Sequence, residues 1–156
     1  MDGLPPVAVG VFGKLPVLGD FLDRGLPRDL VDAWHGWLVA GLAASRPALG
    51  PAFERAYMAA PVWRVVVPAG TLATTGLAGV VLPSVDAAGR LFPLTLAAPL
   101  AAETAIDLLD AEPWFDALEA AGRAGLALDG RPDGWIGGLA GLPPPPGLEP
   151  RPETGW

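Results

Sequence analysis

The chain contains no cysteine and a single histidine, His35. The absence of cysteine excludes disulfides, thiolate nucleophiles and cysteine-ligated metal sites. A zinc site on one histidine would have to take its other protein ligands from carboxylates, which is rare for zinc. We therefore predict that the protein binds no metal and uses no cofactor. We interpret His35 as a partly exposed, hydrogen-bonded helix residue.

Basic residues are scarce as well, and Lys14 is the only lysine. The sequence has 10 Lys and Arg residues against 17 Asp and Glu residues, which gives a formal net charge of −7 and a pI of about 4.5. Nucleic acids attract clustered basic side chains, and so do anionic membrane surfaces. The acidic balance argues against both and suits protein partners better.

Long hydrophobic runs are also missing. The longest apolar stretches, residues 37–44 and 94–102, are much shorter than the roughly 20 residues that a membrane-spanning helix needs. The sequence begins Met-Asp-Gly-Leu-Pro-Pro, without a basic region followed by an apolar core, so no secretory signal is visible. We therefore expect a cytoplasmic protein with no membrane insertion.

The chain is rich in apolar residues and turn formers. It is 51% hydrophobic and 17% charged over 156 residues, which suits one ordered domain. A loop is indicated at residues 13–26 by their density of Gly and Pro. Strands are predicted from β-branched apolar runs bounded by Gly or Pro, at residues 7–12, 62–67, 76–82 and 91–97.

Helices are predicted between and after these strands. Apolar residues three and four apart predict a helix from Pro27 that ends at Pro47 and Gly50. Its expected buried face contains Leu30, Trp34, Trp37, Leu38, Gly41 and Leu42. A shorter helix over residues 51–59 is expected to bury Phe53, Tyr57 and Met58. Further helices are predicted at residues 104–109 and from Pro113, the latter burying Trp114, Leu118 and Leu126.

The order of these elements predicts the fold class. It indicates a single-domain α/β sandwich, with a mixed, mainly antiparallel sheet and helices packed on it. We expect the domain to cover residues 1–130. Residues 131–156 are rich in Gly and Pro, with four consecutive prolines at residues 143–146. They predict an extended tail that acts as a linker or docks on the domain.

Patterns typical of catalysis are weak in this sequence. Gly10, Gly13 and Lys14 suggest a phosphate loop, but the Walker pattern needs four residues between its glycines and a Ser or Thr after the lysine. A Ser-His-Asp triad is formally possible with His35, but no Gly-x-Ser-x-Gly elbow occurs. The loop aspartates are better explained as residues that cap turns.

Two loop segments carry the most specific signal. Residues 13–27 contain Gly-Lys-Leu-Pro, then Gly-Asp-Phe, then Arg-Gly-Leu-Pro. Residues 83–95 contain Pro-Ser-Val-Asp, then Gly-Arg, then Phe-Pro-Leu, and Ala-Pro-Val-Trp-Arg lies between the two segments at residues 60–64. In order and spacing these motifs resemble the signatures of the TagF family of type VI secretion accessory proteins. The resemblance spans about residues 7–120.

The resemblance implies a regulatory function. Members of this family are described as post-translational repressors of the secretion apparatus. They act beside a kinase and phosphatase pair that sets the phosphorylation of a forkhead-associated scaffold protein. The resemblance therefore implies an accessory protein that works by protein–protein binding, with that scaffold as the expected partner, and that is not an enzyme.

The motif residues are also the candidate site. We expect the charged loops to meet at one end of the sheet, with Asp86 starting a type I turn that Gly89 closes. Their charges could form an internal ion-pair network or a partner-binding surface, and we favour the network because motif residues beside Gly and Pro usually specify backbone geometry. The alternative is a small hydrolase or anion-binding enzyme that uses these charges. The candidate residues are Lys14, Asp20, Arg24, Trp63, Arg64, Ser84, Asp86 and Arg90.

Overall fold

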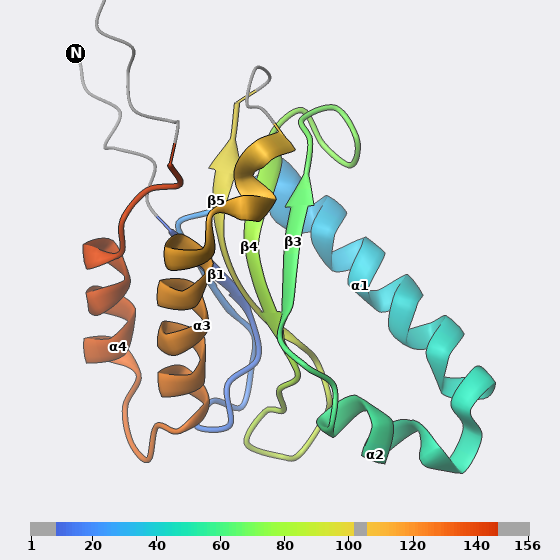
Figure 1. Ribbon diagram of the computed structural model, residues 1–156. Helices are drawn as coiled ribbons and strands as arrows, with labels where there is room; N and C mark the ends of the chain where they lie inside the picture. Colours follow the sequence, from blue (N-terminus) through green and yellow to red (C-terminus); the bar gives the residue numbers. More distant parts are fainter. Residues whose placement is uncertain (1–8, 102–105, 147–156) are drawn as a thin grey trace, which may run out of the picture.

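A single antiparallel sheet forms the centre of the protein (Figure 1). The computed structural model describes residues 9–101 and 106–146. The sheet has five strands in the order β2-β1-β5-β4-β3. These are β1 (Gly10–Gly13), β2 (Leu22–Arg24), β3 (Trp63–Val67), β4 (Gly76–Leu82) and β5 (Leu94–Leu100).

The sandwich with a mainly antiparallel sheet is confirmed, but the sheet is not mixed. Every strand pairing among the described residues is antiparallel. The first strand inserts between β2 and β5, and it runs opposite to both. The sequence could not show this, because a strand pattern does not say which neighbour the first strand will pair with or in which direction.

Helices cover both faces of the sheet. The long helix α1 (Arg28–Leu49) lies on one face, and α3 (Glu112–Leu126) lies on the other with α4 (Asp133–Gly138) beside it (Figure 1). A 3-10 turn, Gly50–Ala52, connects α1 to the short helix α2 (Phe53–Met58). Two more 3-10 turns are η2 (Ile106–Asp110) and η3 (Leu139–Gly141).

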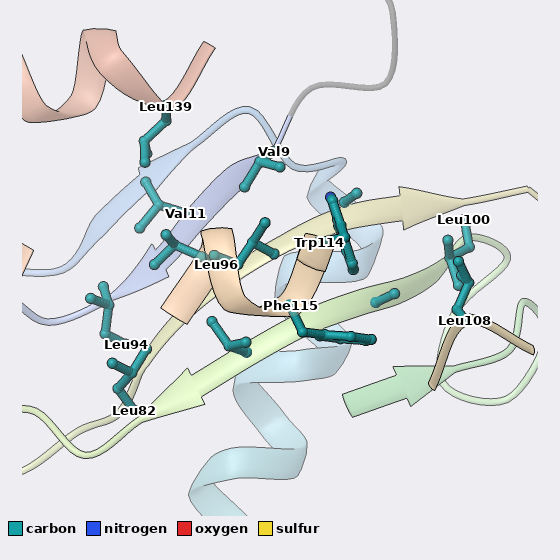
Figure 2. Close-up of a cluster of buried hydrophobic side chains, with 14 of the residues drawn as sticks. Val9, Val11, Leu82, Leu94, Leu96, Leu100, Leu108, Trp114, Phe115 and Leu139 are labelled. Atoms are coloured by element: carbon teal, nitrogen blue, oxygen red, sulfur yellow. The ribbon is translucent and has the colours of Figure 1, made fainter. Parts of the chain in front are cut away.

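The larger core fills the space between the sheet and α3. Phe115 and Leu118 of α3 are fully buried in this core. Figure 2 shows Phe115 together with Val11, Leu82 and Leu96 of the sheet. Burying each such side chain is worth about 2–3 kcal/mol before the entropy cost of folding. The packing of α3 on the central strands β4 and β5 therefore contributes much of the stability of the domain.

A second core lies on the opposite face, beneath α1. Successive residues of a strand point to opposite faces, so Phe12 faces α1 while its neighbour Val11 faces α3. Trp34 is buried in this core, and its indole N–H donates to Thr95 Oγ1 of β5 at 2.9 Å. This bond satisfies two buried polar groups and fixes how the middle of α1 sits on the sheet.

Helix α1 differs from its predicted form in two respects. Trp37 and Gly41 were expected on the buried face, but both are exposed, and Trp37 instead stacks on Trp34. The sheet covers only the stripe that contains Leu30, Val31, Trp34 and Leu38. The helix also continues through Pro47 to Leu49, although it does end at Gly50 as predicted, where the φ of 55° is unfavourable for other residues.

Three smaller predictions need correction. Met58 of α2 is exposed rather than inward-facing, because the short helix buries only Phe53 fully. The predicted loop at residues 13–26 contains the short strand β2, whose Leu22 is buried. Residues 91–93 precede β5, and Leu91 forms an isolated bridge with Val85 instead.

The predicted tail contains a helix and packs on the domain. Trp135 of α4 lies against Gly125 of α3, and its indole N–H donates to the Ala121 carbonyl oxygen at 2.8 Å. The Trp114 indole N–H similarly donates to the Pro143 carbonyl oxygen at 2.8 Å. Glycine in this segment favoured an extended chain, but tertiary packing of Trp135 supports a helix. Residues 147–156 of the predicted tail lie outside the described residues.

The part of residues 104–109 that the structure describes forms the 3-10 turn η2 rather than a regular helix. The predicted helix from Pro113 is present as α3, with the proline in its first turn. Of the helices that the described residues form, none combines the length and apolarity needed to cross a membrane.

Candidate functional site

The predicted turn at Asp86 is present in the connection between β4 and β5. The Gly89 N–H donates to the Asp86 carbonyl oxygen at 3.0 Å, and the φ of Gly89 is 81°. Asp86 Oδ1 accepts two further bonds, from the N–H groups of Ala88 and Arg90, each at 2.9 Å. The carboxylate therefore holds its own loop closed, as turn-forming aspartates commonly do.

The second oxygen of the same carboxylate binds two cations. Asp86 Oδ2 lies 3.0 Å from Lys14 Nζ and 2.7 Å from Arg90 Nε. The relative solvent exposure is only 2% for Asp86 and 8% for Lys14, whereas Arg90 is exposed. Arg90 Nη2 also donates to the Gly19 carbonyl oxygen at 3.1 Å, which connects the loop after β1 to the loop before β5. Lys14 and Asp86 thus form a buried, charge-compensated pair.

The surroundings of Asp86 determine its ionisation. Burial by itself raises the pKa of this carboxyl group, but hydrogen bonds from the Arg90 N–H, the Lys14 ammonium and the Ala88 N–H lower it by more. The pKa of Asp86 therefore lies well below its ordinary value of 3.8. The group stays ionised at neutral pH, and its oxygen atoms are already occupied by four donors.

Ser84 connects three segments that are distant in the sequence. Its Oγ donates to the Lys14 carbonyl oxygen at 2.6 Å. The Tyr57 hydroxyl of α2 donates to the Ser84 carbonyl oxygen at 2.8 Å and accepts from the Ser84 N–H at 2.9 Å. We call Lys14, Tyr57, Ser84, Asp86 and Arg90 the Asp86 network. It ties the two motif loops to the helix that follows α1.

Tyr57 is predicted from the sequence as a buried residue, but the hydrogen bonds of its hydroxyl group are not predicted. Burial raises its pKa to about 12, although its bond with the Ser84 backbone opposes the shift. The sequence contained one signal that could have found it. Tyr57 is the only tyrosine in the chain, and a half-buried tyrosine hydroxyl normally needs a partner.

Asp20 and Arg24 make only local side-chain hydrogen bonds among the described residues and share none with the Asp86 network. Asp20 is exposed, and its Oδ1 accepts a bond from the N–H of the next residue, Phe21, at 2.8 Å. Arg24 is also exposed and donates to the Asp23 carbonyl oxygen at 2.8 Å. The reason is topological, because Arg24 belongs to the edge strand β2 and pairs with Val11 at the start of β1, whereas Lys14 follows the end of β1.

Trp63 and Arg64 lie on the opposite edge strand, β3, and among the described residues they share no hydrogen bond or ion pair with the Asp86 network. Arg64 binds two carboxylates of α3, Glu112 at 2.7 Å and Asp116 at 2.8 Å, and its guanidinium lies over the Phe115 ring at 5.3 Å. Arg64 therefore attaches β3 to α3. Trp63 retains 61% of its exposure.

Taken together, these contacts indicate that the Asp86 network holds the two motif loops in place. A general base needs an accessible oxygen with a pKa close to the working pH, and Asp86 has neither. Within residues 9–101 and 106–146, no group of three or more His, Asp and Glu side chains is placed to hold a metal ion. The geometry favours the structural role over a substrate-binding one for these motif residues.

Replacing Ser84 with alanine tests this role. The change would leave the buried Lys14 carbonyl oxygen without its donor, so we expect the free energy of unfolding to fall by about 1–2 kcal/mol. Ser45→Ala is the control, because Ser45 donates to the Gly41 carbonyl oxygen within α1, and we expect its effect to stay within about 0.5 kcal/mol. Urea unfolding of both variants measures the difference, and equal effects would contradict the role given to Ser84.

Comparison with known proteins identifies the family. The family model described as TagF N-terminal domain, type VI secretion system-associated, matches residues 10–140. No curated protein matches the chain. The crystal structure of PA0076 from Pseudomonas aeruginosa PAO1 is similar, with a TM-score of 0.85 and 38% sequence identity. The match covers 89% of this chain and 64% of that protein. The chain therefore belongs to the TagF family of type VI secretion-associated proteins, and residues 10–140 form its TagF N-terminal domain.

Proposed function

We propose that this protein is a cytoplasmic accessory protein that represses type VI secretion after translation by binding a protein partner. The observation that carries the proposal is the match of the TagF N-terminal domain over residues 10–140. The forkhead-associated scaffold of the regulatory pathway is the expected partner. The formal net charge of −7 also suits a protein partner better than a nucleic acid.

The geometry of the motif loops supports a binding role over a catalytic one. Lys14 and Asp86 are buried and paired with each other, so neither is presented to a substrate. Asp20 is accessible, but its carboxylate oxygen bonds to its own loop. The charged side chains of the motif loops therefore stabilise the loops at the end of the sheet. The strand edges and the exposed helix faces remain for contact with a partner.

A genetic experiment tests the regulatory part of the proposal. In the bacterium that encodes the full protein, deletion of its gene should raise the release of type VI substrates into the medium severalfold, and overproduction should suppress it. Transcript and protein levels of the apparatus should stay constant, because the proposed control is post-translational. Unchanged release in both strains would contradict repression.

A binding experiment tests the partner separately. Purified protein with an affinity tag should retain the purified forkhead-associated scaffold in a pull-down. The tagged protein unfolded by heat is the control for nonspecific retention. If the folded protein does not retain the scaffold while deletion still alters secretion, the protein regulates secretion through another partner, and the scaffold assignment fails.

A further inference from the structure

The two edges of the sheet are protected to different degrees. An edge strand presents unpaired N–H and C=O groups, and proteins usually guard it by keeping it short or charged. The edge strand β2 has three residues, and two of them, Asp23 and Arg24, are charged. The other edge strand, β3, has five residues with the sequence Trp-Arg-Val-Val-Val. Among the described residues, β3 pairs with β4 alone, so its outer edge stays open.

An apolar groove of about 480 Å³ runs along this open edge. Its lining includes Trp37 of α1, Leu109 of η2 and residues 65–67 of β3. Helix α1 and η2 pack on opposite faces of the sheet, because Trp34 belongs to one core and Leu108 to the other. Trp37 and Leu109 retain 54% and 49% of their exposure. Exposed large apolar side chains gathered beside an open strand edge mark a site of protein interaction.

Trp37 packs against a core tryptophan in this groove. Its ring stacks on Trp34, with centroids 4.9 Å apart and an interplanar angle of 13°. Trp34 is in turn fixed by its hydrogen bond to Thr95 in the core. A tryptophan that is already ordered loses little entropy on binding, and such residues frequently dominate the affinity of an interface.

We propose that the outer edge of β3 and the adjoining groove bind an extended segment of a protein partner, which adds to the sheet as a further strand. Backbone hydrogen bonds to β3 would hold the segment. Alternate side chains of an added strand point to opposite faces, so one set would contact Trp37 and the other Leu109. The side chains on both faces of the added strand would contact apolar residues, so we expect the segment to be apolar along its length. The inference deepens the proposed function by assigning its binding surface.

The charges around the groove indicate the flanks of that segment. Arg64 lines the groove and binds the carboxylates of Glu112 and Asp116, so at this rim two acidic side chains accompany one basic side chain. A partner segment with Lys or Arg at its ends complements this rim. A second copy of this chain fits less well, since antiparallel pairing of two β3 edges would bring two such rims and two net charges of −7 together.

A displayed library of short random peptides, selected on the purified protein, tests the surface without assuming a natural partner. We expect selected peptides to be apolar with basic flanks and to slow hydrogen exchange of β3 amides. Trp37→Glu should weaken their binding by at least about 30-fold. Leu109→Glu, on the other wall, should also weaken it. Met58→Glu is the matched control, because Met58 is 52% exposed and lies outside this groove.

Circular dichroism and melting curves must show that each variant is folded. Peptides that protect other segments, equal binding by Trp37→Glu and wild type, or a library that selects nothing at β3 would each overturn the inference. Concentration-dependent self-association that Trp37→Glu abolishes would overturn it in favour of a second copy. The proposed function fails on a different result, the absence of any effect on secretion, so the two failures are distinguishable.

Discussion

Replacing Gly13 with alanine is expected to lower the free energy of unfolding by about 3 kcal/mol or more. The φ of Gly13 is 136°, a backbone conformation that residues other than glycine rarely adopt. An added Cβ would also lie 2.1 Å from the Pro93 carbonyl oxygen and 2.9 Å from Leu94 Cα. Both are backbone atoms, one just before β5 and one at its first residue, so the clash cannot be relieved without disturbing the pairing of β1 with β5.

Gly19→Ala is the matched control for this change. Gly19 lies in the same motif loop, and a Cβ built there would meet no atom within 4 Å. We expect urea unfolding to show little change for Gly19→Ala and a large loss, or failure to accumulate as soluble protein, for Gly13→Ala. Similar stability of the two variants would show that the close approach of Gly13 to β5 does not limit this position.

Replacing Asp86 with alanine should lower the melting temperature by roughly 5–15 °C. The variant would leave the Lys14 ammonium buried without its counter-ion and remove the acceptor of two turn N–H groups. Asp20→Ala is the control, because Asp20 is exposed and bonds only locally among the described residues. Thermal unfolding followed by circular dichroism measures both.

The same variant separates the two roles of the motif loops. A folded Asp86→Ala protein that melts like wild type and no longer represses secretion would mean that Asp86 contacts a partner. Lys14→Met in the Asp86→Ala background should recover part of the lost stability, because it removes the uncompensated buried charge. Failure of this recovery would contradict the assignment of the loss to Lys14.

Asp86 should also make stability depend on pH on the acid side. Its pKa in the folded protein lies below the ordinary value of 3.8, because its hydrogen bonds outweigh the effect of burial. A group with a lowered folded pKa contributes its full stability above the unfolded pKa and loses it as the pH falls through the folded pKa. Stability should therefore decline below about pH 4, and Asp86→Asn should show a shallower decline over that range.

The sequence by itself determined the local elements and the family. The runs at residues 62–67 and 76–82 predicted β3 and β4 to within one residue, because strand propensity and bounding Gly or Pro residues act locally. The Asp86–Gly89 turn followed from local chemistry in the same way. The three co-linear motifs indicated the family, which the match over residues 10–140 confirms.

The tertiary structure decided which of these pieces meet. Lys14 and Asp86 are buried together because β1 terminates at the end of the sheet where the β4–β5 connection lies. Asp20 and Arg24 are exposed to solvent. The exposure of Trp37 depends on how far the sheet extends beneath α1, and helix α4 depends on the packing of Trp135 on α3. These outcomes arise from contacts between residues distant in the chain, whereas periodicity and propensity report only on residues that are close in sequence.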